Sequence, residues 1–514
     1  MPPFNAPVRC FSFRACQLLA LCLLLGILQS VAIPQQPTPG RDVRDYELAG
    51  SRIAPLPPDG QIVSALKQVS PERIHANIAA LVKFNNRSTV SSLETDLPPG
   101  TGVLAASDWI KEQFESYSKA CGNCLEVKVD DFVEQPPTGA AAARARIVKP
   151  TPIRNVYAIL RGADPVQAKR MYLVTGHYDS RETDIMETHS PAPGANDDAS
   201  GVAVSLESAR ILSQYKFPST IVFVCVAGEE QGLNGSRHLA KLAKEEGWQL
   251  EGVLNNDIVG GDTTPGETLQ NKSLVRVFSQ GILPSAPPEI IAQQLSLGME
   301  NDTASRELAR EVLAVGRTYF APLSRPAKPG QFRSLEPVME LRLDRYLRGG
   351  DHSSFSAEGF PAVRFTEWRE NFNHQHQRVR TEDGIEYGDL IKFDDFDYIA
   401  QVARLNMATL ATLALSPGMP QNVRIVTTNL DNNTTLKWDP PVAGPESIQY
   451  QIVWRETAAS DWQFWTDSAK YGAKPGNNSV TLPVSKDNVF FGVRACDRSG
   501  HCSQAVAPLP ERRQ

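Results

Sequence analysis

Residues 171–179 read MYLVTGHYD, an apolar run that ends in a histidine and an aspartate. A short run of this kind, rich in β-branched and apolar residues, predicts a buried strand. Comparable runs occupy residues 155–160, 220–228, 252–257 and 361–367. The segments 200–215 and 235–247, which lie between these runs, carry apolar residues at helical spacing. This alternation predicts an α/β domain with a mostly parallel central sheet and helices on both of its faces.

Helical patterns continue the domain on both sides of the strands. Residues 71–84 and 105–117 carry apolar residues at three- and four-residue spacing, and residues 396–415 form a last helix. We therefore place the α/β domain at residues 61–416. The preceding segment, residues 33–60, is rich in proline and polar residues and is expected to be a linker or pro-segment.

Strand patterns replace helical ones near the C-terminus. Alternating runs occupy residues 423–426, 434–438, 449–455, 478–482 and 489–496. They predict a small all-β sandwich over residues 417–508. This tail resembles a fibronectin type III module, with Pro420 at its start and Trp438 as the buried aromatic of its second strand. Phe490 or Phe491 stands where that module usually has a tyrosine.

The N-terminus has the features of a secretory signal peptide. Arg9 and Arg14 precede an apolar stretch at residues 18–28, which is too short to span a bilayer. Small residues before position 33 predict cleavage after Ala32, so that residues 1–32 are removed; an uncleaved membrane anchor is the alternative. No later segment is apolar for long enough to cross a membrane. We therefore expect an exported protein, extracellular or periplasmic, without a stable membrane anchor.

Charge and cysteine content narrow the class of protein. With 52 Lys and Arg against 58 Asp and Glu, the formal net charge is −6, which gives no electrostatic case for a nucleic-acid binder. In an oxidising compartment, Cys121 with Cys124 and Cys496 with Cys502 are expected to form short-loop disulfides. A redox-active pair is the alternative for the first two. Cys225 lies inside a predicted strand and is expected to be a buried free thiol.

Acidic and histidine side chains follow several of the predicted strands. In open α/β sheets the ligand crevice lies beyond the carboxyl ends of the strands, so these side chains can converge there. They are His177, Asp179, Asp197, Glu229, Glu230, Asp257 and His352. Burial of this many carboxylates together requires cations to neutralise them. Two histidines with several carboxylates, and no convergent cysteine, are typical of zinc at a hydrolytic site.

The motifs GHYDS, PGANDDASG, GEEQGLNGS, NND and DHSSF occur in that order. Over about residues 70–415 they resemble the di-zinc exopeptidases of metallopeptidase family 28, clan MH. The resemblance implies two zinc ions per chain, bridged by Asp197. His177 and Asp257 would complete one zinc site. Glu230 and His352 would complete the other.

The resemblance also implies two residues that act without binding metal. Glu229 would be the general base, and Asp179 would orient the imidazole of His177. The spacing agrees with these roles, since residues two apart at a strand end face the same way. Consecutive glutamates diverge, so Glu230 can bind metal while its neighbour contacts the attacking water.

The sequence departs from the family pattern near the last histidine. Some members have an oxyanion-donating tyrosine before that ligand, and here the position holds Asp351. We consider His374 and His376 as alternative donors, although both could equally lie on the surface or behind the ligands. Glu367, at the end of a predicted strand, is a candidate partner for a substrate ammonium group.

The function favoured by these patterns is a secreted zinc exopeptidase, an aminopeptidase that acts on peptides. A carboxypeptidase or deacylase of the related family is one alternative, and it would need a longer lid insertion before His352. A glutaminyl cyclase, which works with a single zinc, is another. The non-enzymatic alternative is an adhesion or receptor protein. Whether the protein is an enzyme or not, the sandwich is a candidate for binding a surface or polymer.

Overall fold

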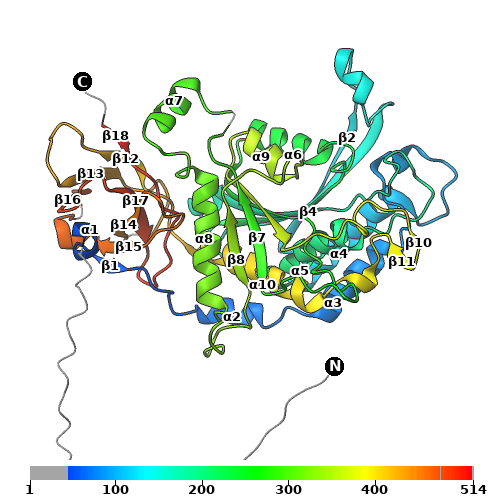
Figure 1. Ribbon diagram of the computed structural model, residues 1–514, viewed down its shortest axis with the longest axis horizontal. Coiled ribbons are helices and arrows are strands. Elements are labelled where there is room, and N and C mark those ends of the chain that lie inside the picture. Colours follow the sequence, from blue (N-terminus) through cyan, green and yellow to red (C-terminus); the bar gives the residue numbers. More distant parts are fainter. Residues whose placement is uncertain (1–43, 284, 446, 475, 512–514) are drawn as a thin grey trace, which may run out of the picture. The chain divides into compact units, whose positions relative to one another are not determined.

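The computed structural model describes residues 44–283, 285–445, 447–474 and 476–511 (Figure 1). The expected signal peptide and its cleavage site lie outside these residues. The helices are α1 (Asp45–Leu48), α2 (Gly60–Leu66), α3 (Pro71–Val82), α4 (Gly102–Ala120), α5 (Ser200–Leu212), α6 (Asn234–Glu245), α7 (Pro288–Ser296), α8 (Ala304–Tyr319), α9 (His352–Ala357) and α10 (Phe396–Leu415). Across the described ranges, none of the helices is both long and apolar enough to span a bilayer.

A large mixed sheet forms the centre of the α/β part. Its strands lie in the order β2-β3-β5-β4-β6-β9-β7-β8. They are β2 (Leu125–Glu134), β3 (Thr151–Leu160), β4 (Arg170–His177), β5 (Thr220–Val226), β6 (Gln249–Asn256), β7 (Leu274–Ser279), β8 (Glu336–Glu340) and β9 (Ala362–Glu367). The adjacent strands β5, β4, β6 and β9 run parallel, whereas β3 and β7 pair antiparallel with β5 and β9. The expected parallel sheet is therefore the middle of a mixed one.

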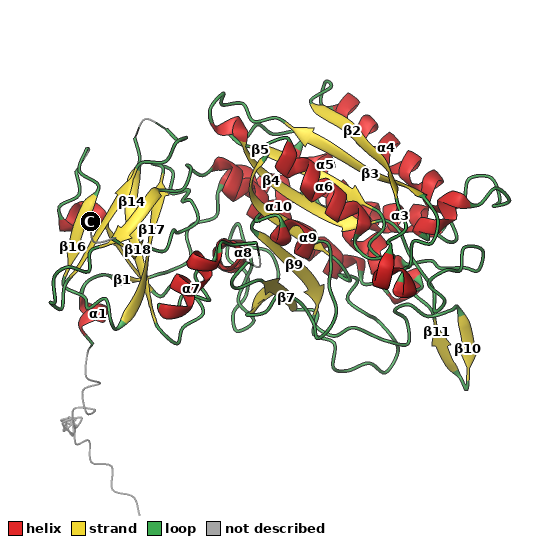
Figure 2. Ribbon diagram, turned by 90° about the horizontal axis from the view of Figure 1, so that it is seen from above, coloured by secondary structure: helices red, strands yellow, loops and turns green. Residues whose placement is uncertain are grey.

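Helices cover both faces of this sheet, as the sequence predicts (Figure 2). Alternate side chains of a strand point to opposite faces. In β5, Val222 and Val224 pack in a cluster with side chains of α6 and α9. Ile221 and Phe223 pack in the larger cluster, which contains side chains of α3, α4, α5, α8 and α10. Strands buried on both faces explain why these runs are continuously apolar.

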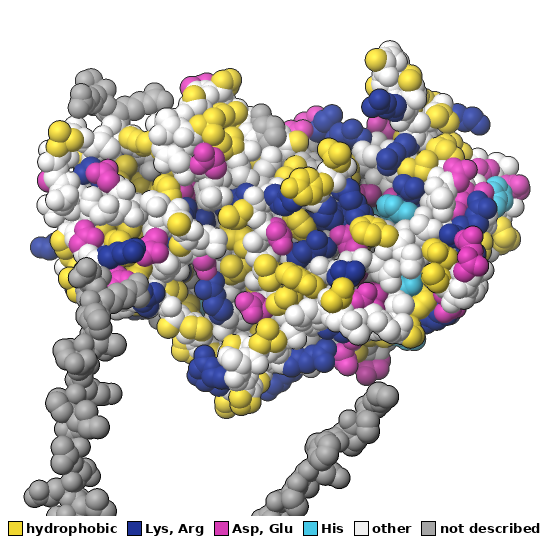
Figure 3. All heavy atoms as spheres, viewed as in Figure 1, with side chains coloured by type: hydrophobic (Ala, Val, Ile, Leu, Met, Phe, Trp, Pro, Cys, Tyr) yellow, Lys and Arg dark blue, Asp and Glu magenta, His cyan; other side chains and the backbone are white. Residues whose placement is uncertain are grey.

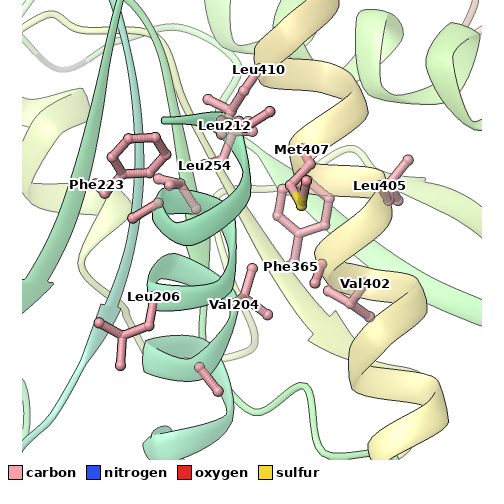
Figure 4. Close-up of a cluster of buried hydrophobic side chains, with 14 of the residues drawn as sticks. Val204, Leu206, Leu212, Phe223, Leu254, Phe365, Val402, Leu405, Met407 and Leu410 are labelled. Atoms are coloured by element: carbon pink, nitrogen blue, oxygen red, sulfur yellow. The ribbon is translucent and has the colours of Figure 1, made fainter. Parts of the chain in front are cut away.

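The larger cluster places α5 and α10 beside each other against the sheet (Figure 4). Leu206 of α5, Leu405 of α10 and Phe365 of β9 are all fully buried there. The helix α10 has the bounds that its periodicity predicts. Its first turn is capped by Asp395, whose side chain accepts a hydrogen bond from the Tyr398 amide.

The C-terminal strands and β1 form two sheets, ordered β1-β15-β14-β17 and β16-β13-β12-β18 in the described part of the chain. They are β1 (Ser51–Arg52), β12 (Gln421–Ile425), β13 (Thr434–Asp439), β14 (Gln449–Glu456), β15 (Phe464–Asp467), β16 (Ser479–Leu482), β17 (Val489–Cys496) and β18 (Leu509–Pro510). Side chains of both sheets share one core, which includes Trp438 and Trp454. All five strands expected here are present, and the likeness to fibronectin type III remains a prediction. A separate hairpin joins β10 (Arg380–Glu382) to β11 (Ile385–Tyr387).

Residues 45–52, part of the segment expected to be a linker or pro-segment, belong to this sandwich. The strand β1 pairs antiparallel with β15. Tyr46 is buried in the sandwich core, and its carbonyl accepts a hydrogen bond from the indole of Trp454. Gly50 lies so close to this indole that a Cβ atom would stand 2.3 Å from the ring. The sandwich therefore contains residues from both ends of the described chain.

Buried polar contacts join the sandwich to α8 and to the residues just before it. Arg455 forms an ion pair of 2.8 Å with Asp302, and both side chains are buried. The indole of Trp462 donates a hydrogen bond of 2.9 Å to Glu307, which also pairs with Arg310. The cysteines pair as expected, because Cys121 is bonded to Cys124 and Cys496 to Cys502. In the described residues Cys225 is a buried free thiol.

Candidate metal centre

The parallel strands bring the expected side chains to one edge of the sheet. His177 is the last residue of β4, and Asp257 directly follows β6. Glu229 and Glu230 follow β5 after a turn at Gly228, whose φ is +79°. Asp197 lies in the loop before α5. In the sheet, β4 lies between β5 and β6. The chain therefore passes from β4 to a neighbour on one side and then to a strand on the other side, and the group lies at this switch point. Ligands bind at such points in open α/β sheets.

Asp198 joins three of the backbone segments that carry this group. One carboxylate oxygen accepts a hydrogen bond from the amide of His177 at 3.0 Å. The other accepts from the amides of Gly201 and Ile258. A Cβ atom on Gly201 would stand 2.2 Å from the Asn256 carbonyl oxygen, so only glycine allows this approach. The aspartate and glycine of the PGANDDASG motif thus hold the loop of Asp197 against β4 and β6.

His177 faces the carboxylates of Asp197 and Asp257. Its Nε2 lies 3.2 Å from Oδ1 of Asp197 and 3.9 Å from Oδ1 of Asp257. Its Nδ1 lies 3.1 Å from the carbonyl oxygen of Asp179 and 3.4 Å from a carboxylate oxygen of the same residue. The carboxylate of Asp179 also accepts hydrogen bonds from the Glu230 amide and the Thr89 hydroxyl. The structure therefore places Asp179 where it can orient the imidazole.

His376 occupies the other side of Asp197. Its Nε2 lies 2.9 Å from Oδ2 of Asp197 and 3.2 Å from Oε1 of Glu230. Gln375 donates a hydrogen bond of 3.1 Å to the same oxygen of Asp197. In the described residues, ligand atoms of Asp197, Glu230 and His376 lie within 4.8 Å of one another, as do those of His177, Glu229 and Asp257.

Among the described residues, neither group includes His352, which the motif resemblance implied as a ligand. His352 begins α9, and its ring points to the loop before that helix. Its Nε2 lies 2.9 Å from the carbonyl oxygen of Leu343 and 3.7 Å from Asp344. His376, which the sequence suggested only as an oxyanion donor, lies where His352 was expected. The HQHQ stretch after β9 is the signal that pointed to it.

The remaining side chains named from the sequence have other surroundings. His374 stacks on Phe393 and lies 3.4 Å from Asp262. Glu367 is fully buried, and its carboxylate accepts hydrogen bonds from the amides of Gly261 and Asp262. Burial raises the pKa of Glu367 to about 8. Its carboxyl group is therefore occupied by hydrogen bonds within the fold.

Electrostatics at the centre favour added positive charge. Burial would lower the pKa of His376, but Glu230 and Asp197 raise it to about 10. Burial would raise the pKa of Asp197, but the nearby imidazoles of His177 and His376 hold it well below its usual range. Burial raises the pKa of Glu229 well above its ordinary value, and Asp257 and Glu230 add to this effect against His177. Carboxylates packed this closely repel one another, and bound cations would relieve this repulsion.

The donor set fits zinc. Imidazole nitrogens and carboxylate oxygens without cysteine are zinc ligands of hydrolytic sites. In the described part of the chain, the buried atoms Nε2 of His177 and Oε1 of Glu230 each lie 3.2 Å from a charged neighbour, Asp197 and His376, but form no hydrogen bond of good geometry. Both atoms face the space between the carboxylates. A cation would satisfy them, which accounts for polar atoms that would otherwise be buried without partners.

Comparison with known proteins identifies the family. The model of peptidase family M28 matches residues 155–280, which include most of the residues described above. A probable zinc metalloprotease of Pyrenophora teres f. teres (strain 0-1) is 42% identical over 473 residues, which cover 90% of this chain and 89% of the relative. The chain belongs to peptidase family M28, as a zinc metalloprotease. A probable zinc metalloprotease of Pyricularia oryzae is 43% identical over 468 residues, covering 90% of this chain and 87% of the relative.

A solved structure gives a more distant comparison for the M28 fold. The aminopeptidase from Aneurinibacillus sp. strain AM-1 is 18% identical, with a TM-score of 0.43. The match covers 70% of this chain and 97% of that chain.

A buried arginine of this M28 metalloprotease contacts Asp257. Arg364 of β9 is fully buried, and its Nη2 lies 2.9 Å from Oδ1 of Asp257. Its Nη1 donates to the Gly349 carbonyl at 2.7 Å and pairs with Asp344 at 3.2 Å. Thr366 accepts a hydrogen bond from its Nε and donates one to the Asp257 carbonyl. The sequence alone did not indicate this arginine, because its contact with Asp257 depends on the pairing of β6 with β9.

Proposed function

We propose that this M28 metalloprotease is an exported aminopeptidase that holds two zinc ions and removes N-terminal residues from peptides. The observation that carries the proposal is the position of Asp197, whose two carboxylate oxygens face different histidines, His177 and His376. A carboxylate with an imidazole at each oxygen is suited to bridge two cations. The preference for a free N-terminus rests on the motif resemblance described above.

The revised ligand set replaces His352 by His376. One zinc would be held by His177, Asp197 and Asp257, and the other by Asp197, Glu230 and His376. Bound zinc would polarise the scissile carbonyl and lower the pKa of a water molecule.

The chain's own residues would then move the protons. Glu229 belongs to the group of His177 and Asp257, where Asp197 can supply the third ligand in its place. Glu229 would then be free to take a proton from the attacking water and deliver it to the leaving amine. Asp179 keeps the His177 imidazole oriented through its Nδ1.

The alternatives differ in metal content and substrate. A glutaminyl cyclase would need one zinc and would act on N-terminal glutamine. A carboxypeptidase or deacylase would require a free C-terminus or an acyl group. A non-enzymatic surface-binding protein would have no need of Glu229. For the tail, a fibronectin type III-like domain that binds a surface or polymer remains part of the proposal.

The test uses the full mature chain, purified and analysed for zinc. We expect about two zinc ions per chain and hydrolysis of leucine anilide but not of its N-acetylated analogue. Removal of metal by a chelator should abolish the activity, and added zinc should restore it. About one zinc with full activity, together with release of ammonia from glutaminyl peptides, would overturn the proposal in favour of the cyclase. Equal hydrolysis of the blocked and free anilides would exclude an aminopeptidase.

A further inference from the structure

Two loops beside the metal centre carry exposed aromatic and aliphatic side chains. One is the loop at residues 341–350, between β8 and α9, and the other is the loop at residues 368–372, after β9. Their exposed apolar side chains are Leu341, Tyr346, Leu347, Trp368 and Phe372. Tyr346 is 81% exposed and Phe372 65%. Large apolar side chains that gather on a surface mark interaction sites more often than chance exposure does. We refer to these two loops as the platform.

Buried ion pairs hold the two loops together. Glu370 of the second loop pairs with Arg345 at 2.8 Å and with Arg348 at 2.6 Å, both from the first loop. Arg276 of β7 pairs with the same carboxylate at 2.9 Å. Burial would raise the pKa of Glu370, but these arginines lower it to about 2, so the carboxylate stays charged. The platform is thus joined by charge-assisted contacts rather than by loose loop packing.

The exposed charge of the platform is positive. Its two carboxylates, Asp344 and Glu370, are buried in ion pairs with arginines. The side chains of Arg342, Arg348 and Arg369 remain partly or largely exposed, the last two in ion pairs with Glu370 and Glu267. Arg342 lies over the ring of Tyr346, 3.8 Å from its centroid. Figure 3 shows Lys and Arg side chains gathered among hydrophobic ones near the middle of the face of Figure 1.

The platform adjoins the metal centre. Glu370 lines the same cavity as Asp197 and Ile258, the residue after Asp257. The Gly349 carbonyl, in the first loop, accepts a hydrogen bond from Arg364, which binds Asp257. Both loops of the platform therefore border the metal centre.

We propose that the platform binds the part of a peptide substrate on the C-terminal side of the scissile bond, and that it favours acidic and apolar side chains there. The proposal rests on the aminopeptidase function, since an aminopeptidase places the N-terminal residue at the metal and the rest of the peptide must leave across the neighbouring surface. Arginines that lie over aromatic rings offer carboxylates a cation and offer apolar side chains a flat surface.

The test compares a substrate that reaches the platform with one that does not. The wild type and the charge-reversed Arg342→Glu are assayed with leucine anilide and with pentapeptides that begin with leucine and continue with acidic or with basic residues. We expect Arg342→Glu to raise KM for the acidic pentapeptide about three- to tenfold, as fits one exposed charge contact, and to leave kcat unchanged. KM for the basic pentapeptide should fall or stay constant, and the anilide constants should not change.

Two matched variants complete the design. Arg73→Glu makes the same charge change on α3, at an exposed position outside the platform, and should have no effect. Tyr346→Ala should raise KM for both pentapeptides without a change for the anilide. If Arg342→Glu leaves KM for the acidic pentapeptide unchanged, or alters all substrates equally, the platform proposal is overturned while the aminopeptidase function stands. If the wild type cleaves neither the anilide nor a free pentapeptide, both proposals fail.

Discussion

Nε2 of His376 lies 2.9 Å from Oδ2 of Asp197, on the carboxylate oxygen that does not face His177. His376 comes from the loop after β9, whereas Asp197 comes from the loop before α5. The loop after β9 thus contributes His376 to a centre whose other side chains lie at the ends of β4, β5 and β6 or before α5. Of the two histidines considered as metal ligands, His376 contacts Asp197, whereas His352 contacts the Leu343 carbonyl.

Replacement of each histidine should therefore have a different effect. His376→Ala is expected to lose about one zinc per chain and to lower kcat/KM more than about a hundredfold, the upper range for a residue that only supports a ligand. His352→Ala should keep both zinc ions, because its ring contacts Leu343 and Asp344. Elemental analysis of the two purified variants, with kinetics on leucine anilide, checks this. Loss of zinc from His352→Ala alone would restore the assignment made from the sequence.

Glu229→Gln should separate proton transfer from metal binding. The amide keeps the shape of the side chain and removes the base, and general acid–base assistance is worth about 10²–10⁴-fold. We expect kcat to fall by about that factor while the zinc content and KM stay close to the wild type. Glu230→Gln is the matched neighbour and should lose metal as well as rate. A Glu229→Gln variant with both zinc ions and more than about a tenth of the wild-type kcat would exclude Glu229 as the base.

The sequence predicts those parts of the centre that local patterns determine. His177, the Glu229–Glu230 pair and Asp257 each end or follow an apolar run, and parallel pairing brings such ends together. The sequence does not show which way His352 points, because an aspartate–histidine pair can mark a metal ligand or simply the first turn of a helix. Its actual direction depends on how residues 343–350 fold against Arg364, which is a long-range packing result that no local spacing encodes.

The same limit applies to the sandwich. Its strands follow from alternation and turn residues, and all those expected are present. The ion pair of Arg455 with Asp302 joins residues far apart in sequence, and the addition of β1 to β15 joins the N-terminal segment to the tail. Such pairings depend on which surfaces meet in the folded chain. Because of them, deletion of the tail would leave the buried Asp302 carboxylate without Arg455 and would remove the Trp462 indole from Glu307, and the peptidase part is not expected to keep its stability alone.

Stability should depend on pH through Glu307 at this junction. Burial raises the pKa of Glu307 to about 7 from the ordinary glutamate value of 4.5, although Arg310 and the Trp462 indole oppose the shift. Between these pH values the folded chain binds the proton more tightly than the unfolded chain. The contribution to stability is therefore present below about pH 4.5 and is lost as pH rises through about 7. At about 1.4 kcal/mol per pKa unit, the full loss corresponds to about 3 kcal/mol.

Glu307→Gln removes this titration and keeps a group that can accept from Trp462. We expect the difference in the free energy of unfolding between wild type and variant to change by about 3 kcal/mol between pH 4.5 and pH 8, in favour of the variant as pH rises. Denaturant unfolding of both full-length proteins at several pH values measures it. A difference that stays constant with pH would show that Glu307 does not titrate in this range.

The last prediction concerns the contact between Arg364 and Asp257. The planar guanidinium holds the Asp257 carboxylate through Nη2 and, on its other side, pairs with Asp344 and the Gly349 carbonyl. A lysine keeps the charge but cannot reproduce this fork, so Arg364→Lys should leave Asp257 free to turn away from the metal. We expect the affinity for one zinc to fall about 10–100-fold, as is usual when a residue that orients a ligand is lost. Competition with a chelator of known affinity measures this without reference to turnover.

Arg276→Lys makes the same substitution in an arginine that contacts Glu370 and the Glu367 carbonyl but not Asp257, and it should keep both zinc affinities. Equal zinc affinities in the two variants and the wild type would show that Arg364 serves only the packing of β9 against the loop at residues 341–350.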